Sequence, residues 1–97
     1  MGREPLTAGV RGPVSDDELL EAIDLAGGGR WEEAHAIVQR DEDDARANWI
    51  HAVVHKIEGD RGNSRYWYRR AGRLEWVDRD PAEELRAIRS ELRSDVN

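Results

Sequence analysis

The sequence contains no cysteine, no phenylalanine, one methionine and a single lysine among its 97 residues. The absence of cysteine excludes disulfides, thiolate metal sites and cysteine nucleophiles. Any bound metal ion must therefore be held by histidine or carboxylate side chains. Apolar runs are also short, and none approaches the roughly 20 residues that a membrane-spanning helix needs.

The amino-terminal stretch lacks the apolar segment of a signal peptide, so we expect a cytoplasmic protein. The net charge is -6, and 37% of the residues are charged. This acidic balance argues against nucleic-acid binding, which depends on cations that neutralise phosphates. We therefore expect neither a membrane nor a nucleic acid as a partner.

The charges are distributed unevenly along the chain. Residues 15–44 hold eleven acidic side chains and two arginines, whereas residues 61–73 hold five arginines and no acid. Two explanations fit this asymmetry. The acidic half could pair with the basic segment inside the fold, or the basic segment could form a site for an anion.

Apolar residues recur at helical spacing through most of the chain, which indicates an all-α fold. A flexible arm that contains glycine and proline, residues 1–14, precedes a single helical domain, residues 15–93, and residues 94–97 should fray. Capping sequences and glycines delimit five expected helices. These helices cover residues 16–26, 30–40, 43–58, 61–71 and 81–93.

Two expected helical hairpins follow the same plan. In each, a glycine turn is followed by a small residue five positions on and by a bulky residue four positions beyond it. A shift of thirty residues superimposes Gly29 on Gly59, Ala34 on Ser64 and Val38 on Tyr68. Over residues 17–72 this pattern resembles tetratricopeptide and Sel1-like helical hairpins. The resemblance implies tandem hairpins that present a binding groove.

A second resemblance is carried by several segments of the same region. They are Ala34-His35 with Gln39, Trp49-Ile50-His51-Ala52 with His55, Glu58-Gly59-Asp60, Asn63, and Tyr66-Trp67-Tyr68-Arg69-Arg70-Ala71-Gly72. In these residues the chain is similar to a family of small, uncharacterised bacterial and fungal α-helical proteins. That resemblance implies a site beside the third and fourth helices, and it implies no particular activity.

The strongest candidate site is a polar row on the third expected helix. His51, His55 and Glu58 are spaced i, i+4 and i+7, so two imidazoles and a carboxylate share one helix face. His35 could add a nitrogen from the neighbouring hairpin. Such ligands suit zinc or iron, which is the cofactor expected for a metal site here. Alternatively, the histidines are structural, and each bonds a backbone carbonyl, Glu58 or a tyrosine hydroxyl.

The second candidate site is the aromatic and basic segment of the fourth helix. Trp67 with Arg70 can border the histidine row, because an aromatic wall beside a guanidinium suits a planar or anionic ligand. The alternative is that Trp67 packs between helices and Arg70 pairs with an acidic residue such as Glu58 or Asp60. Asn63 fits a turn or capping position better than a ligand contact.

Together these patterns predict a bundle of about five helices, built from two hairpins and a C-terminal helix. The expected function is a ligand- or protein-binding hairpin module, as a monomer or weak homodimer, whose partner is a small ligand or a protein segment. The expected site residues are His35, His51, His55, Glu58, Asn63, Tyr66, Trp67 and Arg70. The alternative function is a small metal-dependent or acid/base enzyme that uses His51, His55 and Glu58.

Overall fold

The computed structural model describes residues 13–94. Within that range the chain forms five α-helices and one 3-10 turn, and none of the described residues lies in a strand. The expected all-α class and helix count are therefore confirmed. The elements are α1 (Asp16–Gly27), α2 (Trp31–Val38), α3 (Ala45–Glu58), α4 (Arg61–Ala71), η1 (Leu74–Trp76) and α5 (Pro81–Ser94).

The observed helix bounds agree with the expected ones to within two residues. The largest differences are at α2, which is shorter at both ends, and at the start of α3. Arg30 provides no side-chain cap for α2, whereas Asp44 caps α3 and so makes Ala45 its first residue. None of the described helices combines the length and the apolarity required to cross a bilayer.

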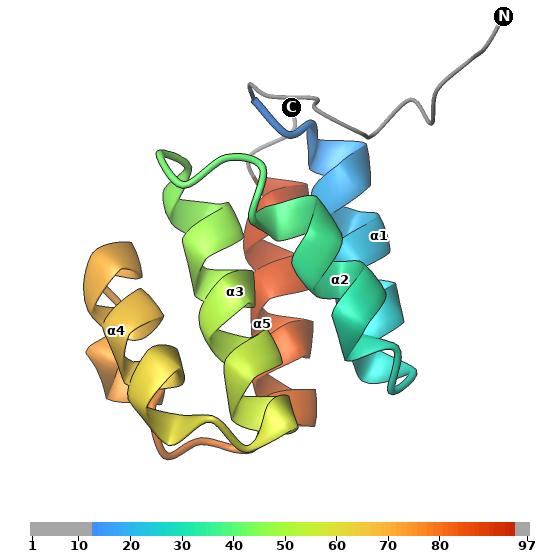
Figure 1. Cartoon of the computed structure of the whole chain (residues 1–97). Helices are drawn as coiled ribbons and strands as arrows, with labels where there is room; N and C mark the ends of the chain where they lie inside the picture. Colours follow the sequence, from blue (N-terminus) through green and yellow to red (C-terminus); the bar gives the residue numbers. More distant parts are fainter. Residues whose placement is uncertain (1–12, 95–97) are drawn as a thin grey trace, which may run out of the picture.

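The central helix of the bundle is α3, with α4 on one side and the α1–α2 hairpin on the other (Figure 1). It packs against α1, α2, α4 and α5. Eight consecutive residues of this helix, 47–54, are buried, because a helix that is surrounded by others hides its whole circumference. Two of the eight are polar, Asn48 and His51. The polar row of α3 therefore begins inside the protein.

Short polar side chains start four of the helices. The Ser15 hydroxyl accepts a hydrogen bond from the Glu18 amide (3.1 Å), and the Glu18 carboxylate accepts one from the Ser15 amide (2.9 Å). These two bonds form the expected capping box. Asp44, Asp60 and Asp80 accept hydrogen bonds from amides in the first turns of α3, α4 and α5. The caps satisfy amides that have no partner within their own helix.

Three helices are followed by a glycine with a positive φ, namely Gly29 (85°), Gly59 (95°) and Gly72 (74°). After each glycine, the next amide donates to the carbonyl five residues earlier, as from Asp60 to His55 (2.9 Å). This bond is characteristic of the Schellman motif, whose left-handed residue is normally glycine. The first two of these turns fold α2 back on α1 and α4 back on α3.

The thirty-residue correspondence between the hairpins is visible in their burial. Ala34 and Ser64, the small residues of the pattern, are both buried, and Val38 and Tyr68, the bulky ones, have no exposed surface. The two hairpins thus share a glycine turn and equivalent buried positions. The likeness to tetratricopeptide and Sel1-like repeats stays a prediction.

Most of the expected N-terminal arm, residues 1–12, lies outside the described residues. Its last residue, Val14, is buried in the core, and its amide donates to the Asp41 carboxylate (3.2 Å). The packed domain therefore includes a residue that precedes the capping box. At the other end α5 continues to Ser94, while residues 95–97 of the expected frayed end are also outside the description.

A buried carboxylate ties α5 to α3 and α4. Glu84 has no exposed surface, and it accepts hydrogen bonds from Trp49 Nε1 (2.8 Å) and from the Tyr68 hydroxyl (2.6 Å). It also forms an ion pair with Lys56 (2.8 Å). These partners compensate for the lost hydration of the carboxylate. Burial raises the pKa of the Tyr68 hydroxyl, as does its bond to Glu84, so this hydroxyl remains a donor.

Candidate functional site

The three histidines of the chain meet between α2 and α3. His35 comes from α2, and His51 and His55 lie one turn apart on α3. The ring centroids are separated by 4.7 Å for His35 and His51, 5.3 Å for His35 and His55, and 5.0 Å for His51 and His55. One ring nitrogen of each residue lies within 4.8 Å of those of the other two. We call these three residues the imidazole cluster.

Glu58 contacts the imidazole cluster through one member only. Its Oε1 lies 2.9 Å from Nδ1 of His55. The sequence suggested a direct ligand position beside His51, but Glu58 instead belongs to a second group of donors with His55 and Asp60. A carboxylate that accepts the Nδ1 proton leaves Nε2 with the lone pair that a metal requires. Glu58 is thus placed to orient a ligand.

His51 is the most buried member of the cluster, with an exposed fraction of 3%. Its Nδ1 is buried and makes no hydrogen bond with any described residue. Burial lowers the pKa of His51 to about 3, and the charges of His35, His55 and Arg70 act in the same direction. The imidazole is therefore neutral near pH 7, and one of its nitrogens has a free lone pair.

His35 is half-buried and also favours the neutral form. Burial lowers its pKa, and the charge that His55 carries when protonated lowers it further, while Glu58 acts in the opposite direction. Neutral imidazole is the form that binds metal ions. At least two members of the cluster therefore hold this form without competition from protons near pH 7.

Trp67 of α4 packs against the cluster. Its ring stacks on His51 with a centroid distance of 3.9 Å and an interplanar angle of 12°. The Arg70 guanidinium lies 5.1 Å from the Trp67 ring centre and donates to the backbone carbonyl of Glu42 (3.0 Å). Trp67 thus packs between helices, as the structural alternative stated. Arg70 pairs with an acidic residue, as that alternative also stated, but this residue is Glu42 in the loop before α3 (3.8 Å) and not Glu58 or Asp60.

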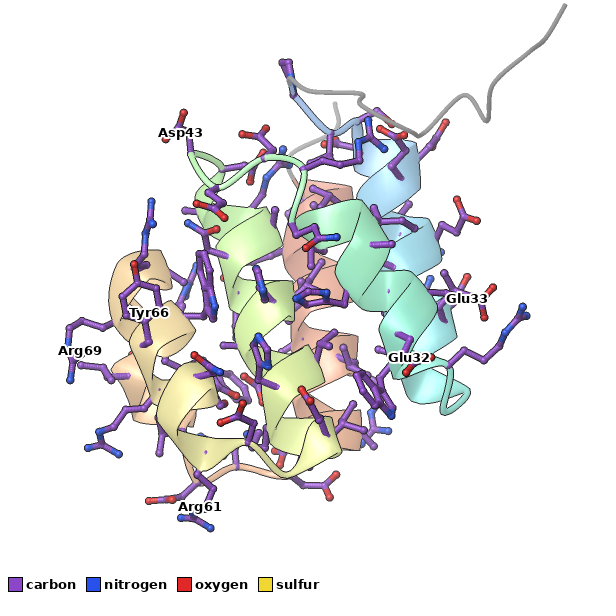
Figure 2. The ribbon with its side chains drawn as sticks, in the orientation of Figure 1. Glu32, Glu33, Asp43, Arg61, Tyr66 and Arg69 are labelled. Carbon is purple, nitrogen blue, oxygen red and sulfur yellow. The ribbon has the colours of Figure 1, made fainter. Side chains whose placement is uncertain are left out.

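Two other predicted site residues have partners outside the cluster. Tyr66 is 46% exposed, and it lies on the face of α4 that is turned toward the viewer in Figure 2. Its hydroxyl accepts a hydrogen bond from Arg70 (3.4 Å). Asn63 donates to the Asp60 carboxylate through its side chain (2.7 Å) and its amide. Asn63 is therefore a capping residue, as the sequence favoured.

The donor set fits a transition-metal ion. In a tetrahedral zinc site, with Zn–N distances of 2.0–2.1 Å, ligand nitrogens lie about 3.3 Å apart. The nitrogens of the cluster are within 4.8 Å of one another, so small side-chain rotations would bring them to that spacing. Imidazole suits zinc, copper, iron and nickel. The site would offer two ligands from the central helix, a third from α2 and an orienting carboxylate.

Glu84 and Lys56, which form the buried ion pair between α5 and α3, are not among the residues that the sequence pattern singled out. An acidic residue in the first turn of a helix normally faces solvent and favours the helix dipole. One signal was available, because Glu84 precedes Ile88 by four positions and Leu92 by eight, which places it on the apolar face of α5. The other partner, Lys56, is the single lysine of the chain.

Comparisons with known proteins do not add to this description. No protein-family model matches the sequence, and no curated protein and no solved structure shows significant similarity to it. The chemistry of the site must therefore be derived from its own residues and their geometry.

Proposed function

We propose that this protein is a ligand-binding helical module whose ligand is a divalent transition-metal ion, zinc or iron, bound by His35, His51 and His55. The observation that carries the proposal is the convergence of three imidazole nitrogens within 4.8 Å from two helices. These are the three histidines of the whole chain. The Glu58 carboxylate, which contacts His55, supplies the outer partner that metal-bound histidines usually have.

The hydrogen bonding of the cluster supports a metal over a purely structural role. Structural histidines near a core are normally satisfied by hydrogen bonds. Among the described residues only His55 has such a partner, Glu58, and the buried Nδ1 of His51 has none. A buried polar atom without a partner costs about 1 to 3 kcal/mol. A metal ion that binds the three rings would gather their lone pairs at one point.

The test is zinc binding by protein that carries no affinity tag. We expect one zinc ion per chain in calorimetric titrations, and elemental analysis of the purified protein should find metal in the same ratio. His35→Ala, His51→Ala and His55→Ala should each weaken zinc binding by about 100-fold or more, because two imidazoles rarely retain the ion. Circular dichroism would verify that each variant is folded.

A matched pair of acid substitutions separates the site from general attraction between charges. Glu58→Gln should weaken zinc binding by about 10- to 100-fold through loss of the orienting carboxylate. Glu32→Gln removes the same charge from the start of α2 (Figure 2) and should leave the affinity unchanged. The proposal would be refuted if any one of the three histidine variants bound zinc as tightly as wild type. It would also be refuted if the wild-type protein showed no saturable zinc binding.

A second candidate is a metal-dependent enzyme, and the number of ligands favours it. A metal held by the three histidines would have a fourth tetrahedral position open for water, as in catalytic zinc sites, whereas structural sites have four protein ligands. Such water becomes a nucleophile near neutral pH. Hydrolysis of 4-nitrophenyl acetate by the zinc-loaded protein, absent in His51→Ala, would distinguish this enzyme from a binding module.

A further inference from the structure

A groove lies between the start of α4 and the segment that follows η1. Its volume is about 550 Å³, within the range of about 300 to 1,000 Å³ that is typical of small-molecule sites. The lining includes none of the three histidines, so this groove is separate from the imidazole cluster. The residues that line it are Lys56, Gly59, Arg61, Gly62, Ser64, Arg65, Val77, Asp78 and Arg79.

The groove concentrates positive charge on an acidic protein. Four of its lining residues are cationic and one, Asp78, is acidic, although the chain as a whole has a net charge of -6. A cation would be repelled by this lining, whereas an anion would gain charge-assisted hydrogen bonds from it. The charge of the groove therefore selects for an anion.

Two of the four cations are already engaged by the protein. Lys56 pairs with Glu84 (2.8 Å) and donates to three backbone carbonyls, the nearest being that of Arg79 (2.7 Å). The Arg79 side chain pairs with Glu83 (3.2 Å) and stacks on Trp76. These two residues thus build the wall of the groove rather than offer free donors.

The other two cations, Arg61 and Arg65, are available to a ligand. They lie one turn apart on the same face of α4, both are exposed, and neither forms a hydrogen bond, ion pair or ring contact with the described residues. Figure 2 shows Arg61 at the start of α4, with its side chain directed away from the bundle. The acidic half of the chain therefore leaves these two guanidinium groups unpaired.

We propose that this groove binds a small organic phosphate monoester, with the phosphate held by Arg61 and Arg65. Guanidinium groups match phosphate oxygens in a bidentate geometry, so two of them on one face suit a dianion. The remaining volume, beside Val77 and the open positions of Gly59 and Gly62, accommodates the organic part. A Cβ added at either glycine would meet no atom within 4 Å other than those of the adjoining backbone, so the lining is uncrowded.

Phenyl phosphate, titrated into ¹⁵N-labelled protein at constant ionic strength, tests the proposal by amide chemical shifts. Saturable shifts should centre on residues 61–65 and 77–79. The double variant Arg61→Ala/Arg65→Ala should bind at least about tenfold more weakly, since it loses the charge-assisted bonds. Inorganic phosphate should bind more weakly than phenyl phosphate because it does not fill the groove.

Two controls with opposite expectations complete the design. Arg86→Ala removes an exposed arginine of α5 that does not line the groove, and it should leave phenyl phosphate binding unchanged. Asp78→Asn removes the single acid of the lining and should strengthen binding. Unchanged binding in the double variant, shifts centred elsewhere, or no saturation in the millimolar range would overturn the proposal. Zinc binding is tested with the histidine variants and phosphate binding with the arginine variants, so either proposal can be refuted while the other stands.

Discussion

At the scale of single residues, the chain packs its three histidine rings in close contact. The His51 ring is stacked on Trp67 and lies about as near to His35 as to His55. A charge on any one ring would be repelled by a charge on another, and burial disfavours charge on His51 in particular. His35 and His51, whose pKa values are lowered mainly by burial, therefore favour the neutral form, which is also the form that a metal ion requires.

This arrangement predicts that stability falls in mild acid. The pKa of His51 is about 3 in the folded protein against 6.5 for the free side chain, so the unfolded chain binds more protons between these values. The neutral His51 ring therefore contributes its whole stabilising effect above about pH 6.5. This contribution to the free energy of unfolding is lost as the pH falls toward 3. We expect a loss of about 2 to 3 kcal/mol between pH 7 and pH 4, measured in metal-free buffer by urea unfolding.

The control for this prediction is His51→Gln, which removes the titrating ring. His35 has a lowered pKa as well and contributes with the same sign, so the slope should become smaller without vanishing. The informative range is about pH 6.5 to 5, above the ordinary pKa of carboxylates. An equally steep slope in this variant over that range would mean that other groups cause the acid sensitivity.

At the scale of elements, the hairpins depend on left-handed glycines. The turn between α3 and α4 places Gly59 at a φ of 95°, and the same turn positions the end of the polar row. Leu, Ala or any other side chain at that φ brings its Cβ against the following carbonyl. The fold therefore requires glycine here for its backbone conformation and not for lack of space in the surroundings, since a Cβ would meet no atom within 4 Å beyond Gly59 and its two chain neighbours.

Gly59 and Gly62 form a matched pair that tests this requirement. Gly62 is exposed in the first turn of α4 and, like Gly59, has open space around a potential Cβ. Gly59→Ala should lower the free energy of unfolding by about 1 kcal/mol, because of the left-handed φ. Gly62→Ala should raise it by about 0.5 to 1 kcal/mol, since alanine favours helix. Thermal melts that place both variants on the same side of wild type would contradict this account.

At the scale of the whole molecule, α3 organises both the core and the candidate site. Its buried residues include Trp49, which reaches Glu84 on α5, and His51, which reaches Trp67 on α4. The Trp49–Glu84 hydrogen bond thus joins α3 to α5, and the His51–Trp67 stack joins α3 to α4. We assign global stability mainly to the first contact, because Trp49 combines a large buried volume with a bond to a buried carboxylate.

The prediction at this scale is an order of stabilities. Trp49→Ala should lower the free energy of unfolding by about 3 to 5 kcal/mol, because it leaves a large cavity and removes a donor from Glu84. His51→Ala should cost no more than about 2 kcal/mol, since the variant loses a stacked ring but also an unpartnered buried nitrogen. Circular dichroism melts of metal-free protein would measure both, and the reverse order would make the histidines part of the scaffold.

Most of the fold could be predicted from the sequence because its signals are local. The Ser15–Glu18 capping box, the aspartate caps and the glycine turns act over five residues or fewer, and their energies do not depend on distant parts of the chain. The inner face of α5, with Leu85, Ile88 and Leu92, follows from helical spacing in the same way. The exceptions were Val14, whose burial depends on packing, and the exact ends of α2.

The candidate site was predicted only in part, because only some of its contacts are set by local sequence signals. Sequence by itself determined that His51 and His55 share a helix face, and that a carboxylate lies one turn further on. Only the tertiary structure decided that His35 joins them, that Glu58 contacts one ring, and that Arg70 turns to Glu42. Helix geometry sets distances within about two turns, whereas distances between helices depend on the packing of the whole core, which also decided that Glu84 is buried.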